Sequence, residues 1–162
     1  MGSRIKILWL VSLFLLGCGQ LAFQDTPKHI ENFKGILVDG GKTTFEEQKG
    51  KATLLTLTAS WCPACREELP LLRKLDQEFS DSGFRIIMVS EDKTAAIAAK
   101  FKKKTKIPWT TFHWNYDMMN TLGNPGVIPV SYLIDENNNV VKFYAGVFDE
   151  NDLKKAIRKI LK

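Results

Sequence analysis

Two cysteines separated by two residues are the clearest candidates for chemistry in this sequence. Cys62 and Cys65 follow a predicted strand at residues 52–58 and open a predicted helix at residues 63–79. Unpaired N–H groups and the helix dipole at a helix N-terminus favour the reactive thiolate. Pro63 suits the first helical turn, where its missing N–H costs nothing. The pair therefore predicts thiol–disulfide exchange, with Cys62 as nucleophile and Cys65 as resolving thiol.

Two structural uses of this pair fit the sequence less well. A zinc site needs about four ligands, and the chain adds only His29 and His113 to the pair. We therefore expect no metal and no cofactor beyond the redox-active disulfide itself. A purely structural disulfide across so small a loop would add little stability.

The N-terminus has the layout of an export signal. Residues 1–17 contain two basic residues, an apolar run at 7–16 and a small residue before Cys18, as in a secretory signal peptide. The apolar run is about half the length needed to span a bilayer as a helix. The Leu-Leu-Gly leading into Cys18 resembles a bacterial lipobox, which implies lipidation of that cysteine. An ordinary signal peptide, or an uncleaved anchor, remains the alternative.

Length and composition indicate one globular domain. The chain has 162 residues, of which 44% are hydrophobic and 25% charged, with a net charge of +5. A domain of this size buries a core without help from disulfides, so its cysteines are available for chemistry. The densest basic stretch, residues 100–106, indicates either a surface for anionic lipid or nucleic acid, or lysines that complement a helix dipole. We favour the second interpretation and expect no nucleic-acid partner.

The remaining pattern alternates strands and helices. We interpret residues 18–32 as a lipidated cysteine and linker, and residues 33–162 as one domain. Alternation of this kind predicts an α/β fold, with a mixed central sheet, helices on both faces and an N-terminal β-hairpin. The predicted strands are 33–38, 42–44, 52–58, 84–89, 108–114, 130–134 and 140–144, and the predicted helices are a turn at 45–49, then 63–79, 93–104, 117–122 and 149–161. The apolar side of the helix at 63–79 is expected to carry Leu69, Leu72, Leu75 and Phe79, and that of the helix at 93–104 to carry Ala96, Ile97 and Phe101.

The ten residues from Trp61 to Pro70 read Trp-Cys-Pro-Ala-Cys-Arg-Glu-Glu-Leu-Pro. They resemble the active-site segment of the thioredoxin-like TlpA/ResA family of extracytoplasmic thiol–disulfide oxidoreductases. The likeness continues, mostly as pattern, from Phe33 to the C-terminus. It implies a thioredoxin-like fold and an enzyme that exchanges electrons with exported proteins, as several members do in cytochrome c maturation.

The resemblance also implies roles for individual residues. Glu68 would be an acid near the thiols that helps Cys65 lose its proton, although a solvated acid favoured by the helix dipole is the alternative. The bond between Ile128 and Pro129 would be cis, and the Ile128 backbone would pair with a substrate strand.

Two residues would flank the attacking sulfur, and two positions depart from the family pattern. Trp61 would form an apolar shoulder beside that sulfur, and Pro63 would line the same substrate groove. Val130 stands where a threonine is common after the cis-proline. Thr56 stands where thioredoxin has a buried aspartate, so Thr56 provides no carboxylate for proton transfer. These departures bear on redox potential and on partner choice.

We therefore predict a monomeric, membrane-anchored lipoprotein that faces the periplasm or the cell exterior. It would reduce disulfides in cysteine-containing exported proteins and receive electrons from a membrane protein. The alternatives are an oxidant that introduces disulfides and a redox-inert tethered binding module. A peroxidase fits less well, because no proline and threonine precede Cys62 at the usual spacing.

Overall fold

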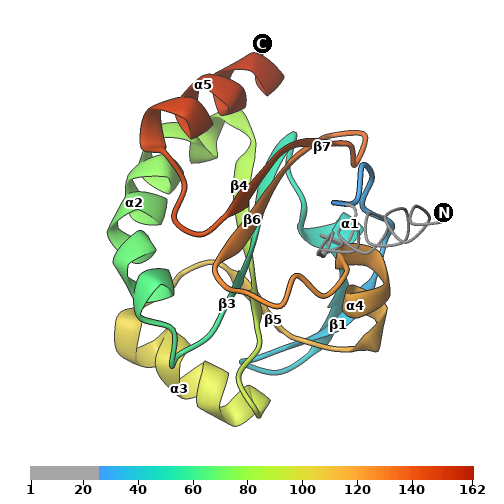
Figure 1. Ribbon diagram of the computed structural model, residues 1–162, viewed down its shortest axis with the longest axis vertical. Helices are drawn as coiled ribbons and strands as arrows, with labels where there is room; N and C mark the ends of the chain where they lie inside the picture. The colour runs from blue at the N-terminus through green and yellow to red at the C-terminus, as the bar shows by residue number, and fades with distance from the viewer. Residues whose placement is uncertain (1–25) are drawn as a thin grey trace, which may run out of the picture.

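The computed structural model describes residues 26–162, which form a seven-stranded sheet with helices on both faces (Figure 1). The strand order is β2-β1-β5-β4-β3-β6-β7. The strands are β1 (Lys34–Leu37), β2 (Lys42–Thr44), β3 (Ala52–Thr58), β4 (Phe84–Ser90), β5 (Thr110–His113), β6 (Val130–Asp135) and β7 (Val140–Ala145). The helices are α1 (Phe45–Gln48), α2 (Pro63–Phe79), α3 (Ala95–Thr105), α4 (Tyr116–Leu122) and α5 (Glu150–Ile160), with a 3-10 turn at Ser80–Ser82.

The centre of the sheet is parallel and its two edges are antiparallel. β3 pairs in parallel with β4, and β4 with β5. β6 pairs antiparallel with the other side of β3, and β7 antiparallel with β6. Every residue of β3 is buried, which explains its continuous run of Leu, Ala and Thr, since a strand covered on both faces does not alternate. The predicted mixed sheet and N-terminal hairpin are confirmed.

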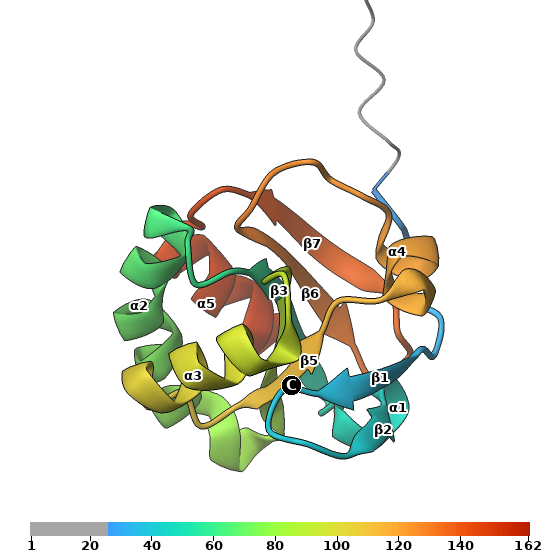
Figure 2. The same cartoon turned by 90° about the horizontal axis from the view of Figure 1, so that it is seen from below.

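Two layers of helices cover the sheet (Figures 1 and 2). On one face, α2, α3 and α5 pack over an apolar cluster to which α2 contributes its predicted inward face. On the other face, α1 and α4 cover a second cluster. The buried α2 side chains are Leu69, Leu72, Leu75 and Phe79, those of α5 include Leu153 and Ile157, and those opposite include Phe45, Met118 and Leu122.

The inward face of α3 differs from the prediction. The sequence placed Ala96, Ile97 and Phe101 on the apolar side of this helix. Phe101 does pack against the core, but the structure buries Ala98 and leaves Ala96 exposed and Ile97 44% exposed. A helix that begins Ala-Ala-Ile-Ala-Ala has little contrast between its faces, so its periodicity does not determine which side turns inward.

The end of the predicted linker takes part in the fold. Ile30 is fully buried, and its N–H donates to the Asn138 carbonyl at 2.9 Å. His29 forms an isolated antiparallel bridge with Asn139. The ordered domain therefore includes residues before the predicted boundary at residue 33.

The predicted signal peptide and Cys18 lie outside the described residues. Within residues 26–162, none of the helices combines the length and the apolar character that crossing a membrane requires.

Candidate active site

The two cysteines form a disulfide at the start of α2. Their Cα atoms are 5.4 Å apart. Cys62 is the N-cap of the helix, and its Sγ accepts a hydrogen bond from the Cys65 N–H at 3.1 Å. Pro63 occupies the first helical position, as predicted. An N–H aimed at Cys62 Sγ stabilises negative charge on that sulfur after reduction, so the geometry favours Cys62 as the attacking thiolate.

A cis peptide bond between Ile128 and Pro129 lies against the disulfide. Cys62 Sγ is 3.8 Å from the Ile128 carbonyl oxygen, and Ile128 packs against the small cluster of Ala59, Cys62 and Cys65. The Pro129 carbonyl accepts a hydrogen bond from the Gly146 N–H at 2.8 Å, which joins this loop to the end of β7. The predicted cis bond is therefore present at the predicted place, and the substrate-pairing role of Ile128 stays a prediction.

Apolar side chains are exposed on the segments that carry this site. Trp61, next to Cys62, is 62% exposed. Val127, beside the cis-proline loop, and Val147, next to Gly146, are also exposed. The cysteines themselves are only 4% and 2% exposed. A chain that reaches the sulfur therefore meets exposed apolar side chains, among them a tryptophan, a residue type enriched in protein–protein interfaces.

Glu68 lies one helical turn beyond Cys65 and is buried, with 2% of its surface exposed. Burial raises the pKa of its carboxyl from 4.5 to about 7, against the opposing effect of a hydrogen bond from the Phe148 N–H at 3.3 Å. Such a group changes protonation near neutral pH, which suits a proton acceptor for a thiol. The position of Glu68 fits the predicted role, and that role remains a prediction.

Asp92 organises the loop before Cys62, and sequence reasoning missed it. Its carboxylate accepts hydrogen bonds from the Ser60 N–H at 3.1 Å and the Ser60 hydroxyl at 2.6 Å. It also accepts one from the Ser90 hydroxyl at 2.9 Å. Asp92 lies two residues after the end of β4, and Ser60 lies two residues after the end of the parallel strand β3. The one available signal was a pair of acids, Glu91 and Asp92, just after a buried strand that neighbours the strand before the cysteines.

Three other polar residues lie near the carboxyl end of β3, and they differ in how their side chains are satisfied. The Thr56 hydroxyl, at the position of the thioredoxin aspartate, accepts a hydrogen bond from the Ser131 hydroxyl at 2.9 Å. The buried Thr58 hydroxyl has no hydrogen-bond partner within residues 26–162. Glu91, in the loop after β4, is half-buried, and this burial raises its carboxyl pKa. Glu68 is therefore not the only acid near the site with a raised pKa.

A mixed sheet with a disulfide at a helix N-terminus, opposite a cis-proline, defines the class of thioredoxin-like thiol–disulfide oxidoreductases. Comparison with known proteins then places the chain within a family. The sequence model of the Redoxin family matches residues 25–159. The chain therefore belongs to the Redoxin family.

Curated relatives carry names that agree with this class. The chain is 24% identical to a thiol-disulfide oxidoreductase ResA from Bacillus cereus, over 98% of both chains. It is 27% identical to a ResA from Bacillus anthracis, over 82% of this chain and 77% of that protein.

Solved structures share the fold. A thiol:disulfide interchange protein from Chlorobium tepidum matches with a TM-score of 0.71 and 23% identity, over 84% of this chain and 97% of that one. A thiol:disulfide interchange protein from a Bacteroides species matches with a TM-score of 0.68 and 25% identity, over 84% and 90%.

Proposed function

We propose that this protein reduces disulfides in other exported proteins while tethered to a membrane. The observation that carries the proposal is the Cys62–Cys65 disulfide at the start of α2, beside the cis-proline loop and exposed apolar side chains. A protein substrate can reach Cys62 there and pair its backbone with the loop.

The reaction begins from the reduced pair. The Cys62 thiolate attacks one sulfur of the substrate disulfide, forms a mixed disulfide and releases the other substrate sulfur as a thiolate, which takes a proton. Cys65 then loses its proton and attacks Cys62 Sγ. This step releases the second substrate thiol and forms the Cys62–Cys65 disulfide. Two electrons have passed to the substrate, and a dithiol donor must restore them.

Glu68 is the proposed acceptor of the Cys65 proton. Its carboxyl lies on the same helix, one turn further on, and is shielded from water. A carboxylate with a pKa of about 7 is ionised in roughly half of the molecules at neutral pH. It can therefore accept a proton in one step and return it in a later one.

Location and partners are proposed from the sequence. The signal-like N-terminus and the resemblance of residues 15–18 to a lipobox support export and a lipid anchor. The expected partners are cysteine-containing exported proteins and a membrane protein that supplies electrons. Resemblance to the TlpA/ResA family supports a place in cytochrome c maturation, and we expect the protein to act as a monomer.

The test is the reduction potential of the cysteine pair, measured by equilibrating the full chain with dithiothreitol or glutathione. A value near −270 mV, as in thioredoxin, supports a reductant. A value near −120 mV, as in DsbA, indicates an oxidant instead. If the pair does not equilibrate with either reagent, both the reductant and the oxidant hypotheses are refuted. That result favours a binding module, whose function would survive Cys62→Ser. The Cys65→Ser variant provides the baseline, because it forms no internal disulfide.

A further inference from the structure

A second surface feature adjoins the disulfide, on the side away from the cis-proline. It is a groove of about 280 Å³ between the start of α2 and the outer face of α3. Ser60, two residues before Cys62, lines one end, and Arg66, directly after Cys65, lines the same wall. β3 lies between this groove and the cis-proline. β6, which begins directly after Pro129, pairs along one edge of β3, and β4, which precedes α3, pairs along the other edge. The α3 wall is formed by Ile97, Lys100, Phe101, Lys104 and Thr105.

Three cations on this groove have no anionic partner within residues 26–162. Arg66, Lys100 and Lys104 are exposed, and none of them forms an ion pair or a side-chain hydrogen bond with that part of the chain. By contrast, Lys102 on the same helix pairs with Asp39 at 2.7 Å. The groove therefore has unneutralised positive charge beside the redox pair.

The helix dipole does not account for all of this charge. Lysines in the last turn of α3 complement its negative end. Lys100, however, lies before that turn, and it repels Lys104 four residues on. Arg66 stands near the positive end of α2, where a cation is disfavoured. Positive charge is present here at a local cost to stability, so a binding role explains it better than helix stabilisation does.

The groove also offers apolar surface. Ile97, which the sequence pattern placed inside, is 44% exposed, and Phe101 is half-buried. None of the residues that line the groove is acidic. The carboxylate of Asp92, which binds Ser60 at one end of the groove, is buried. An occupant thus meets exposed cations around an apolar floor.

We infer that this groove binds an acidic, partly apolar segment of the substrate protein, flanking the disulfide that reacts with Cys62. The inference rests on the proposed function and specifies its substrate class. Charge complementarity selects the segment, and the place of Ser60 and Arg66 beside the cysteines puts it within a few residues of the reacting sulfur. The substrate is then held on two sides: its backbone by the cis-proline loop, and its acidic flank by the groove.

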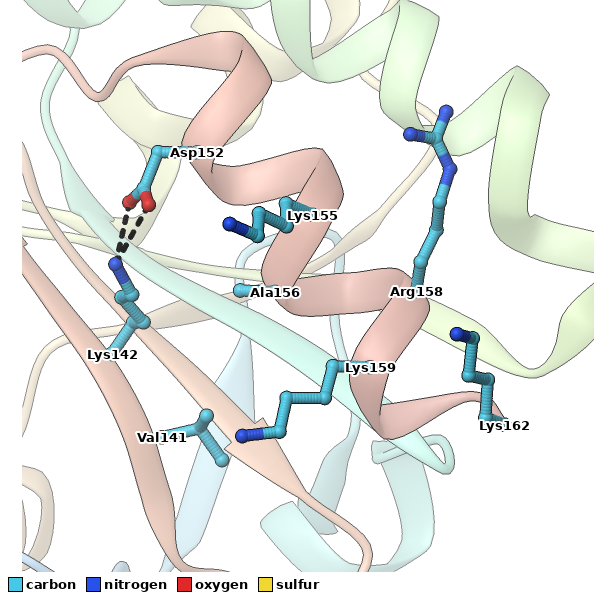
Figure 3. A pocket seen from close by; sticks show the side chains of 8 residues that line it. All are labelled: Val141, Lys142, Asp152, Lys155, Ala156, Arg158, Lys159 and Lys162. Atoms are coloured by element: carbon cyan, nitrogen blue, oxygen red, sulfur yellow. Dashed lines mark hydrogen bonds and ion pairs between the residues drawn. The ribbon is translucent and has the colours of Figure 1, made fainter.

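A larger basic groove on α5 provides a matched control (Figure 3). It encloses about 640 Å³ beside β7. Its Lys142 is paired with Asp152 at 2.8 Å, while Lys155 and Lys159 have no such partner within residues 26–162. Strand register places the start of β7 beside the end of β6, which pairs with the start of β3. The α5 groove therefore lies at the opposite end of the sheet from the disulfide.

The test compares two disulfide-containing peptides of equal length, one flanked by glutamates and one by glutamines. The full chain is solubilised in detergent and reduced, and the second-order rate of disulfide reduction is measured for each peptide at low and high salt. We expect the wild type to reduce the acidic peptide about tenfold faster at low salt, the effect of a few exposed ion pairs. This ratio should fall towards 1 as salt screens the charges.

The variants then locate the effect. Lys100→Glu/Lys104→Glu should bring the ratio of the two rates to 1 or below. Lys155→Glu/Lys159→Glu changes the net charge equally and should keep the wild-type ratio. Equal ratios in both variants overturn the groove assignment, as does a wild-type ratio near 1 at every salt concentration, which needs no variant to fold. Exchange with neither peptide overturns the proposed function, and this inference with it.

Discussion

Replacing Glu68 with glutamine should make the protein more stable above neutral pH and change little in acid. Glutamine keeps the shape of the side chain and can still accept the Phe148 N–H, but it has no charge to bury. Burial raises the carboxyl pKa from 4.5 to about 7. At 1.36 kcal/mol for each pH unit, this corresponds to at most about 3 kcal/mol of free energy.

The direction follows from proton binding. Between pH 4.5 and about 7, the folded wild type keeps the proton that the unfolded chain has lost. Stability conferred by protonated Glu68 is therefore full below pH 4.5 and is lost as the pH rises through 7. The Glu68→Gln variant lacks this titration. Its advantage in unfolding free energy should grow from near zero at about pH 4 to at most about 3 kcal/mol at about pH 8.5.

The assay is urea denaturation of the full chain followed by circular dichroism, from about pH 4 to about pH 8.5, with the disulfide kept oxidised. Glu67→Gln is the matched control, because Glu67 is the exposed neighbour of Glu68 and its replacement should leave the curve unchanged. Parallel curves for the wild type and Glu68→Gln across the whole range would refute the reasoning. A Glu67→Gln effect of equal size would point to net charge instead of burial.

Three further predictions test the site and the fold. Cys65→Ser should accumulate a mixed disulfide between Cys62 and a substrate peptide, visible by mass spectrometry; rapid release of the peptide would contradict the assigned order of attack. Asp92→Asn should lower the unfolding free energy by about 1–3 kcal/mol, because it weakens buried hydrogen bonds to a charged acceptor, and unchanged urea denaturation would count against this network. Gly35→Ala should cost about 1–3 kcal/mol by overpacking, since the new methyl group would overlap the Phe112 ring; calorimetry showing an unchanged melting temperature would exclude that clash.

Much of the fold could be predicted because its signals are local. The bounds of α2 agree with the prediction at both ends, since Pro63 begins the helix and a regular apolar series ends at Phe79. β3 agrees equally well, because a buried strand is a continuous run with clear ends. At the site, the cysteines and their helix follow from the same local pattern, while the cis bond before Pro129 came from the family resemblance alone.

What could not be predicted depends on contacts between distant parts of the chain. Asp92 and Ser60 are 32 residues apart and meet only because β3 and β4 are parallel neighbours. The raised pKa of Glu68 depends on burial beneath the segment that contains Phe148, 80 residues later. Ile30 belongs to a segment without hydrophobic periodicity, so the sequence pattern does not predict its burial. It is buried because the neighbouring His29 forms a bridge with Asn139.

The place where the described chain enters the fold bears on access to the redox pair. Lys28 and His29 lie beside the start of β7, at the end of the sheet where β3 begins. The disulfide follows the other end of β3, and that strand of seven residues spans about 23 Å. Residues 28–30 and the redox pair therefore lie at opposite ends of the sheet, separated by about the length of β3. The start of the described chain consequently leaves the approach to Cys62 open, because its contacts are made at the far end of the strand that leads to the disulfide.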